Sequence, residues 1–154
     1  MKEYIKASLH DLNAIFDIVQ SSIRKTYPRY YPKEVVDFFC DLHSKERIQE
    51  DIEAGMVGIL LVDGECVGTG CYNDNHITRV YVKPECQGKG YGSYIMDRLE
   101  KSISDNYPKA ELDASLPACH LYETRGYKTI KHGKHLVEND VVLVYEVMEK
   151  TLEE

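Results

Sequence analysis

Apolar side chains recur every three or four residues near the start of the chain, which predicts an amphipathic helix. Ser8 and Asp11 precede this pattern with the spacing of a capping box, and a short strand is expected before them at residues 3–7. Pro28 disfavours helical geometry in the residue before it, so the helix should end near Tyr27. The residues that define its apolar face are Leu12, Ile15, Phe16, Val19 and Ile23.

Two further helices are expected next: Pro32 suits the first turn of one at Lys33 to Leu42, and Ser44 caps another that closes at Gly55. From residue 57 the apolar period changes to two, which predicts strands. Asp63-Gly64 is typical of a two-residue hairpin turn. The later elements are expected, in order, as strands Val57–Val62, Glu65–Tyr72 and His76–Val82, helix Tyr91–Ile103, strand Ala110–Asp113, helix Pro117–Thr124, and strands Tyr127–Lys131 and Val141–Met148. This order indicates a mixed α/β sheet.

Length and composition narrow the class of protein. The chain has 154 residues with no internal repeat or linker, so one domain spanning residues 1–154 is expected. Apolar residues make up 43% and charged residues 29%, which excludes wholesale disorder. Nineteen Lys and Arg against 26 Asp and Glu give a net charge of −7. This balance argues against a nucleic-acid-binding protein and is compatible with a cationic partner such as an amine.

The five cysteines are scattered and form no C-x-x-C motif, which predicts free thiols in a reducing compartment. The first residues contain no apolar signal-peptide core, and the longest apolar runs, Ile59 to Val62 and Val141 to Tyr145, are too short to span a bilayer. The sequence therefore predicts a cytoplasmic protein that does not enter the membrane. The terminal strand is apolar on both faces, which leaves a monomer or a homodimer open.

The most informative stretch is Gln87-Gly88-Lys89-Gly90-Tyr91-Gly92, a glycine loop between a predicted strand and a predicted helix. Glycines let a ligand approach the backbone, and a helix N-terminus presents unpaired N–H groups with positive polarity, so the loop is suited to phosphate groups. It is not a Walker A loop, because no G-K-[S/T] ends it. It is not a dinucleotide fingerprint either, because it lacks a glycine at Ser93.

These six residues match the Q/R-x-x-G-x-G/A signature of the GCN5-related N-acetyltransferases. Downstream, Leu112 to Tyr127 resembles the strand of that family followed by its A-x-x-x-Y-E-x-x-G-F helix and turn. The two motifs have the expected separation, and the resemblance covers nearly the whole chain. It implies the GNAT (acyl-CoA N-acyltransferase) fold, an α/β domain with a mixed, mostly antiparallel twisted sheet flanked by helices.

The resemblance also implies that acetyl-CoA is the co-substrate. By position, the strand before the loop would offer backbone groups to the pantetheine arm, and the loop would cradle the pyrophosphate. Ser115 stands where many relatives carry an asparagine that contacts the pantetheine arm, so this contact is expected in altered form. The cofactor-binding residues implied are Val80, Tyr81, Val82, Gln87, Gly88, Lys89, Gly90, Tyr91, Gly92, Ser93 and Ser115.

An amine attacks a thioester only when it is neutral, and alkylamines have a pKa of about 10, so a base is needed. By the resemblance, His76 takes the place of the base, although it could be an exposed turn residue. Glu65, Asp74 or a chain of water molecules are the alternatives. Tyr122 matches the tyrosine of the family motif and is expected to protonate the leaving thiolate, the alternative being a packing role.

The aromatic segment Tyr27 to Pro32 is either a rigid surface loop or a wall that contacts the acceptor. On the second interpretation, Tyr30, Tyr31 and Tyr72 bind the acceptor. A small amine or polyamine fits the acidic chain, and a protein N-terminus or lysine is the rival acceptor. A module that binds acyl-CoA without turnover is the alternative of a different class.

No metal site is expected. His132-x-x-His135 has the spacing of a metal pair, but the adjacent Gly133 favours a turn. His120 is expected on the surface, and Cys86 and Cys119 are expected to be small packing residues.

Overall fold

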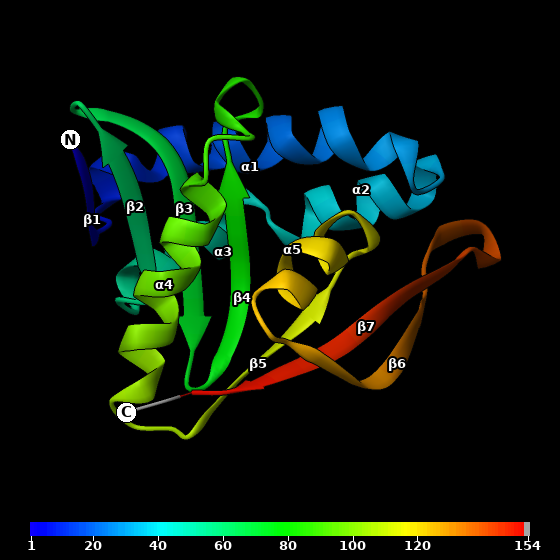
Figure 1. The fold of residues 1–154 in the computed structure, drawn as a ribbon. Coiled ribbons are helices and arrows are strands. Elements are labelled where there is room, and N and C mark those ends of the chain that lie inside the picture. The colour runs from blue at the N-terminus through cyan, green and yellow to red at the C-terminus, as the bar shows by residue number, and fades with distance from the viewer. Residues whose placement is uncertain (153–154) are drawn as a thin grey trace.

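The structure is a computed structural model, and it describes residues 1–152. Its centre is a seven-stranded sheet in the order β1-β2-β3-β4-β5-β7-β6 (Figure 1). All neighbouring strands are antiparallel except β4 and β5, which confirms the predicted mixed, mostly antiparallel sheet. The strands are β1 (Lys2–Lys6), β2 (Val57–Val62), β3 (Glu65–Asn73), β4 (His76–Val82), β5 (Lys109–Ala114), β6 (Lys128–Leu136) and β7 (Val142–Thr151).

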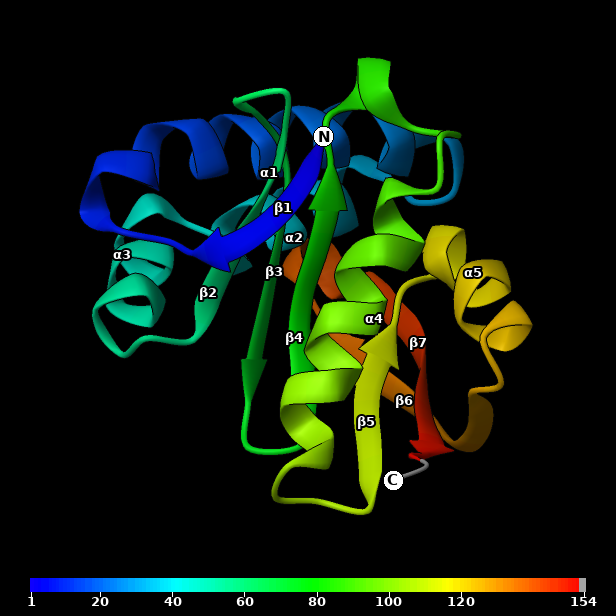
Figure 2. The ribbon, with the colours of Figure 1, turned by 60° about the vertical axis from the view of Figure 1, so that its left-hand side comes forward.

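Helices cover both faces of the sheet (Figures 1 and 2). One face carries α1 (Leu12–Thr26), α2 (Lys33–Leu42) and α3 (Lys45–Glu53), and the other carries α4 (Tyr91–Ser104) and α5 (Cys119–Thr124). These helices confirm the predicted segments to within a few residues. None of the helices within residues 1–152 has the length and apolarity that crossing a membrane requires.

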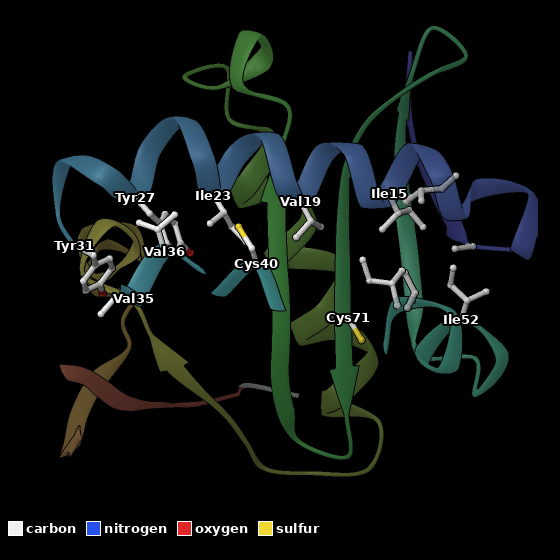
Figure 3. Close-up of a cluster of buried hydrophobic side chains, with 14 of the residues drawn as sticks. Ile15, Val19, Ile23, Tyr27, Tyr31, Val35, Val36, Cys40, Ile52 and Cys71 are labelled. Carbon is white, nitrogen blue, oxygen red and sulfur yellow. The ribbon is translucent and has the colours of Figure 1, made fainter. Parts of the chain in front are cut away.

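The first helix forms as its sequence predicts. The Ser8 N–H donates a hydrogen bond to the Asp11 carboxylate at 2.9 Å, and a short 3-10 turn leads into α1. The apolar face of α1 then packs on β2 and β3 together with side chains of α2 and α3. Figure 3 shows Ile15, Val19, Ile23 and Tyr27 in this cluster. They follow one another at intervals of four residues, which keeps all of them on one side of the helix.

The second core holds α4 against β3 and β4. Two glycines in β3 make this close packing possible: a Cβ atom at Gly68 would lie 2.8 Å from Ile95, and one at Gly70 would lie 2.7 Å from the same side chain. A side chain at either position would collide with Ile95 of α4, so the packing of α4 on the sheet would have to shift. Because the glycine loop leads directly into α4, these two glycines also set the position of that loop.

The predicted turn at His132–His135 is wrong, because both residues lie in β6, which pairs with β7 as far as Leu136. Gly133 allows the ring of Tyr145, its partner in β7, to lie directly against the backbone of β6. A Cβ atom at Gly133 would overlap that ring. His132 and His135 are three residues apart and therefore point to opposite faces of the sheet. Within residues 1–152, no three His, Cys, Asp or Glu side chains are grouped closely enough to hold a metal ion.

Other expectations about individual residues are confirmed. All five cysteines are free, and Cys86 and Cys119 pack against the second core. His120 is exposed.

The interpretation of residues 27–32 as a surface loop is wrong in part, because Tyr27 and Tyr31 are buried in the first core and Tyr27–Arg29 forms a 3-10 turn.

Candidate active site

The parallel strands β4 and β5 separate soon after they begin to pair. Only His76 with Glu111 and Ile77 with Leu112 are in register, and the later residues of the two strands have no partners in each other. Figure 1 shows β5 running obliquely away from β4. A cavity of about 480 Å³ opens beside the separated strands. Residues from α2, α3, β4, β5, α5 and β7 line it. Its size is in the range of sites for small molecules.

A β-bulge in β4 places two residues beside this cavity, Ile77 and Arg79, on opposite faces of the sheet. The pairing of β4 with β3 shifts by one residue at Thr78, between Ile77 and Arg79. As a result, Ile77 packs in the core under α4, whereas Arg79 contacts His43 at the end of α2, on the other face of the sheet. Without the extra residue, the two side chains would point to the same face.

The glycine loop ends at the N-terminus of α4. Gly88 and Gly90 have φ angles of +81° and +84°, a conformation that other residues rarely adopt, and a Cβ at either position would meet nothing within 4 Å. No side chain of the described residues caps α4, so backbone N–H groups of its first turn, from Tyr91 onward, are available to an anion. The side chain of Gln87 donates to the Val82 carbonyl at 3.2 Å, which fixes the loop to the end of β4.

Three hydroxyl groups bridge the gap between the strands. Tyr27 Oη lies 3.1 Å from Tyr81 Oη of β4 and 3.3 Å from Ser115 Oγ, which directly follows β5. Burial raises the pKa of Tyr27 above its usual range, so its hydroxyl stays protonated. The sequence singled out Ser115 and Tyr81 as cofactor-binding residues, but it indicated Tyr27 only as the start of the aromatic segment and not as their partner. The signal was present, because Tyr27 continues the four-residue apolar spacing of α1.

Tyr122 lines the cavity from α5. Burial, and then the neighbouring Tyr27 and Cys119, raise the pKa of Tyr122 well above its ordinary value. Its hydroxyl is therefore protonated at neutral pH, as a proton donor requires. No residue of the described chain forms a hydrogen bond with this hydroxyl, whereas the nearby Tyr127 hydroxyl donates to Glu100 at 2.9 Å.

His76 also lines the cavity, at the start of β4, and its Nε2 lies 3.8 Å from a carboxylate oxygen of Asp113 on β5. Imidazole next to a carboxylate is suited to accept a proton. The alternative bases lie elsewhere: Glu65 pairs with Lys83 at 2.9 Å, and Asp74 borders a shallow depression outside the cavity.

A buried charged cluster forms another part of the cavity wall. Arg79 Nε donates to His43 Nδ1 at 3.2 Å, and Arg79 Nη2 donates to Asp51 at 2.9 Å. Burial, followed by the charges of Arg79 and Arg47, lowers the pKa of His43 to about 3. These residues come from α2, α3 and β4 and the segments beside them, so no local sequence pattern could have indicated the cluster.

None of the three tyrosines predicted to bind the acceptor lines the cavity. Tyr30 is 52% exposed on the surface. Tyr31 is buried, and its hydroxyl accepts a hydrogen bond from the Leu116 N–H at 2.6 Å. Tyr72 borders the same separate depression as Asp74. The cavity instead brings Val80, Tyr81 and Ser115 together with the two predicted catalytic residues, Tyr122 and His76.

Comparison with known proteins agrees with this fold. Residues 26–152 match the model of the acetyltransferase (GNAT) domain family. The chain is 22% identical over 134 residues to "Uncharacterized N-acetyltransferase YafP" of Escherichia coli K12, which covers 87% of this chain and 84% of that protein.

Two solved structures share the architecture. One, from Rhodopseudomonas palustris, is described as "GCN5-Related N-acetyltransferase: Aminotransferase, Class-II" and has a TM-score of 0.89 at 21% identity, covering 99% of this chain and 96% of that one. The other is PaiA N-acetyltransferase of Thermoplasma acidophilum in complex with coenzyme A. It has a TM-score of 0.76 at 20% identity and covers 98% of this chain and 99% of that one.

Proposed function

Because this chain belongs to the GNAT family of acetyltransferases, we propose that it transfers an acetyl group from acetyl-CoA to a primary amine while both substrates are bound. One observation carries the proposal. The cavity where β4 and β5 separate holds a buried, protonated tyrosine and a histidine, and the glycine loop with its free helix N-terminus follows β4 directly. An acyl transfer between two substrates needs these groups together.

The residues of the glycine loop fit the pyrophosphate of coenzyme A. The N–H groups of Gly88 to Ser93 can approach phosphate oxygens because no side chain stands over Gly88 or Gly90. Backbone groups of Val80, Tyr81 and Val82 would hold the pantetheine arm, and Ser115, joined to Tyr27, would take the place of the usual asparagine. In support, the related PaiA was crystallised with coenzyme A. When bound, acetyl-CoA supplies an activated acetyl thioester.

The protein's own side chains move the protons. His76 would take a proton from the amine on its imidazole ring, with Asp113, which lies 3.8 Å from Nε2, stabilising the charged imidazole. Tyr122 would donate its hydroxyl proton to the sulfur as the C–S bond breaks and the N–C bond forms. Because burial raises the pKa of Tyr122, the tyrosinate would recover its proton readily after each turnover.

The acceptor is expected to be a small amine, including polyamines, because the protein carries a net charge of −7 and the carboxylates of Glu50, Asp51 and Asp113 line the cavity. A protein N-terminus or lysine is the rival. Five free cysteines support a cytoplasmic location.

The proposal is tested by isothermal titration of the protein with acetyl-CoA, free CoA and NAD, followed by a thiol-release assay on a panel of amines that includes spermidine and peptides. Micromolar binding of the CoA species alone, with thiol release by at least one amine, is the expected result. If neither CoA species binds, the glycine loop is only structural and the proposal is wrong. Binding without turnover of any amine would instead indicate a module that binds acyl-CoA without catalysis.

A further inference from the structure

We propose that Arg125 is a positioning residue for the acetyl transfer: it fixes α5, and with it Tyr122, against the first turn of α4. This inference rests on the proposed function, in which Tyr122 is the proton donor, and adds to it a residue that does not line the cavity. Coenzyme A would have its pyrophosphate at the start of α4 and its sulfur at Tyr122. The reaction therefore depends on how these two helices lie relative to each other.

Arg125 directly follows α5 and binds α4 through all three nitrogen atoms of its guanidinium group. Nη1 donates to the Ser93 carbonyl at 3.2 Å, and Nη2 donates to Asp97 at 2.7 Å. The carboxylate of Glu100 accepts from Nη2 at 2.8 Å and from Nε at 3.3 Å. Ser93 is in the first turn of α4, within the proposed pyrophosphate site. One side chain thus connects the end of α5 with about two turns of α4.

The contact between Arg125 and Glu100 is largely shielded from water, since their side chains are 12% and 11% exposed. Two hydrogen bonds from one guanidinium group to one carboxylate fix the relative orientation of the two groups as well as their distance. Burying both charges has a desolvation cost, so such a pair contributes less to stability than its short distances indicate. Its clearer effect is to fix the orientation of α5 on α4.

Tyr122 is coupled to Arg125 through the backbone. The N–H of Arg125 donates to the Tyr122 carbonyl at 3.1 Å, within the last turn of α5. No described residue forms a hydrogen bond with the Tyr122 hydroxyl, so its place in the cavity depends on where α5 lies and on the packing of its ring on Tyr127.

The other contact between α5 and the first turn of α4 is apolar. Figure 2 shows α5 beside this part of α4, and a Cβ atom at Gly92 would lie 3.7 Å from the Leu121 side chain. A contact of this kind lets two helices slide, because dispersion attraction has little directional preference. α5 has only six residues, and Tyr122 is its one buried side chain. The directional bonds of Arg125 are therefore what set the position of this short helix along α4.

The test is a double-mutant cycle of Arg125→Met and Tyr122→Phe, measured by thiol release at saturating acetyl-CoA with the fastest acceptor of the amine panel. Arg125→Met should lower kcat at least about tenfold, because a reacting group that is misplaced by about 1 Å loses much of its effect. The affinity for acetyl-CoA should stay unchanged, since Gln87 still holds the loop to β4. In the Tyr122→Phe background, Arg125→Met should change kcat less than about twofold, because no hydroxyl is left to misplace.

Lys150→Met is the matched control. Lys150 donates to the same carboxylate oxygen of Glu100 at 3.1 Å, but it comes from β7 and not from α5. This substitution removes an ion pair and leaves α5 bonded to α4, so it should lower stability in chemical denaturation and keep the wild-type kcat. Arg125→Lys, which can keep a bond to Glu100, should recover part of the kcat lost in Arg125→Met.

A wild-type kcat in Arg125→Met, or a loss of equal size in both backgrounds, would overturn the inference and leave the acetyl transfer standing. A wild-type kcat in Tyr122→Phe would do the same, since Arg125 would then have no proton donor to position. Absence of thiol release by the wild type with every amine would overturn both the inference and the proposed function. If Arg125→Met does not fold, Arg125→Lys goes through the same cycle, with the same outcomes deciding.

Discussion

The hydroxyl oxygens of Tyr27 and Tyr81 lie 3.1 Å apart, although the two residues are 54 positions apart in the chain. Tyr27 directly follows α1, and Tyr81 lies near the end of β4. Their contact, continued to Ser115, links the helical layer to both strands at the point where the strands separate. The shape of the cavity therefore depends on a residue outside both sequence motifs.

Replacing Tyr27 with phenylalanine removes this link and keeps the ring, which packs edge-on against Phe39. We expect the free energy of unfolding to fall by about 1 kcal/mol, because the hydroxyl groups of Tyr81 and Ser115 lose their hydrogen bonds to Tyr27. Acetyl-CoA binding should weaken as well, which calorimetry would measure. Tyr30→Phe is the control, since Tyr30 is exposed and should change neither quantity. Unchanged affinity in Tyr27→Phe would show that the bridge has no role in binding.

Tyr122→Phe should lower kcat by about a hundredfold or more, because it removes the proposed proton donor. The affinity for acetyl-CoA, measured by titration, should stay the same. Tyr127→Phe is the matched control, as its hydroxyl binds Glu100 outside the cavity and its loss should affect stability rather than kcat. If Tyr122→Phe keeps the wild-type kcat, Tyr122 is a packing residue.

Gly90→Ala and Gly64→Ala form a pair that separates strain from binding. Both glycines have a φ of +84°, and a Cβ atom at either position would meet nothing within 4 Å, so each substitution should cost about 1 kcal/mol of stability in chemical denaturation. Only Gly90 lies at the start of α4, so only Gly90→Ala should also weaken acetyl-CoA binding. Equal affinities in the two variants would remove the glycine loop from the proposed site.

His43 should make the protein less stable in acid. Its pKa is about 3 in the folded protein and about 6.5 when unfolded, so between these values the unfolded chain binds more protons and stability rises with pH. The neutral ring makes its full contribution to the free energy of unfolding above pH 6.5, and this free energy falls by about 2 kcal/mol by pH 5. Denaturation at pH 8 and pH 5 should therefore show a smaller acid loss in His43→Gln than in the wild type. An identical loss would mean that His43 is not held neutral.

Much of the fold could be predicted from local sequence. The spacing of Ile15, Val19 and Ile23 predicted α1, and Asp63-Gly64 predicted the β2–β3 hairpin, because these patterns act over a few residues. The glycine loop and the Tyr122 motif were found in the same way. The turn predicted at Gly133 was wrong. In the sequence, a glycine that is required by an aromatic ring on the neighbouring strand cannot be told from a turn glycine.

The sequence by itself determined the elements, the family resemblance and the residues of the two motifs, because each depends on neighbours along the chain. Only the tertiary structure decided which side chains share the cavity. It buried Tyr27 and left Tyr30 outside, and through the bulge at Thr78 it turned Arg79 toward His43. The physical reason is that successive side chains of a strand point to opposite faces of the sheet. One extra residue in a strand therefore turns the side chains after it to the other face, where they contact different helices.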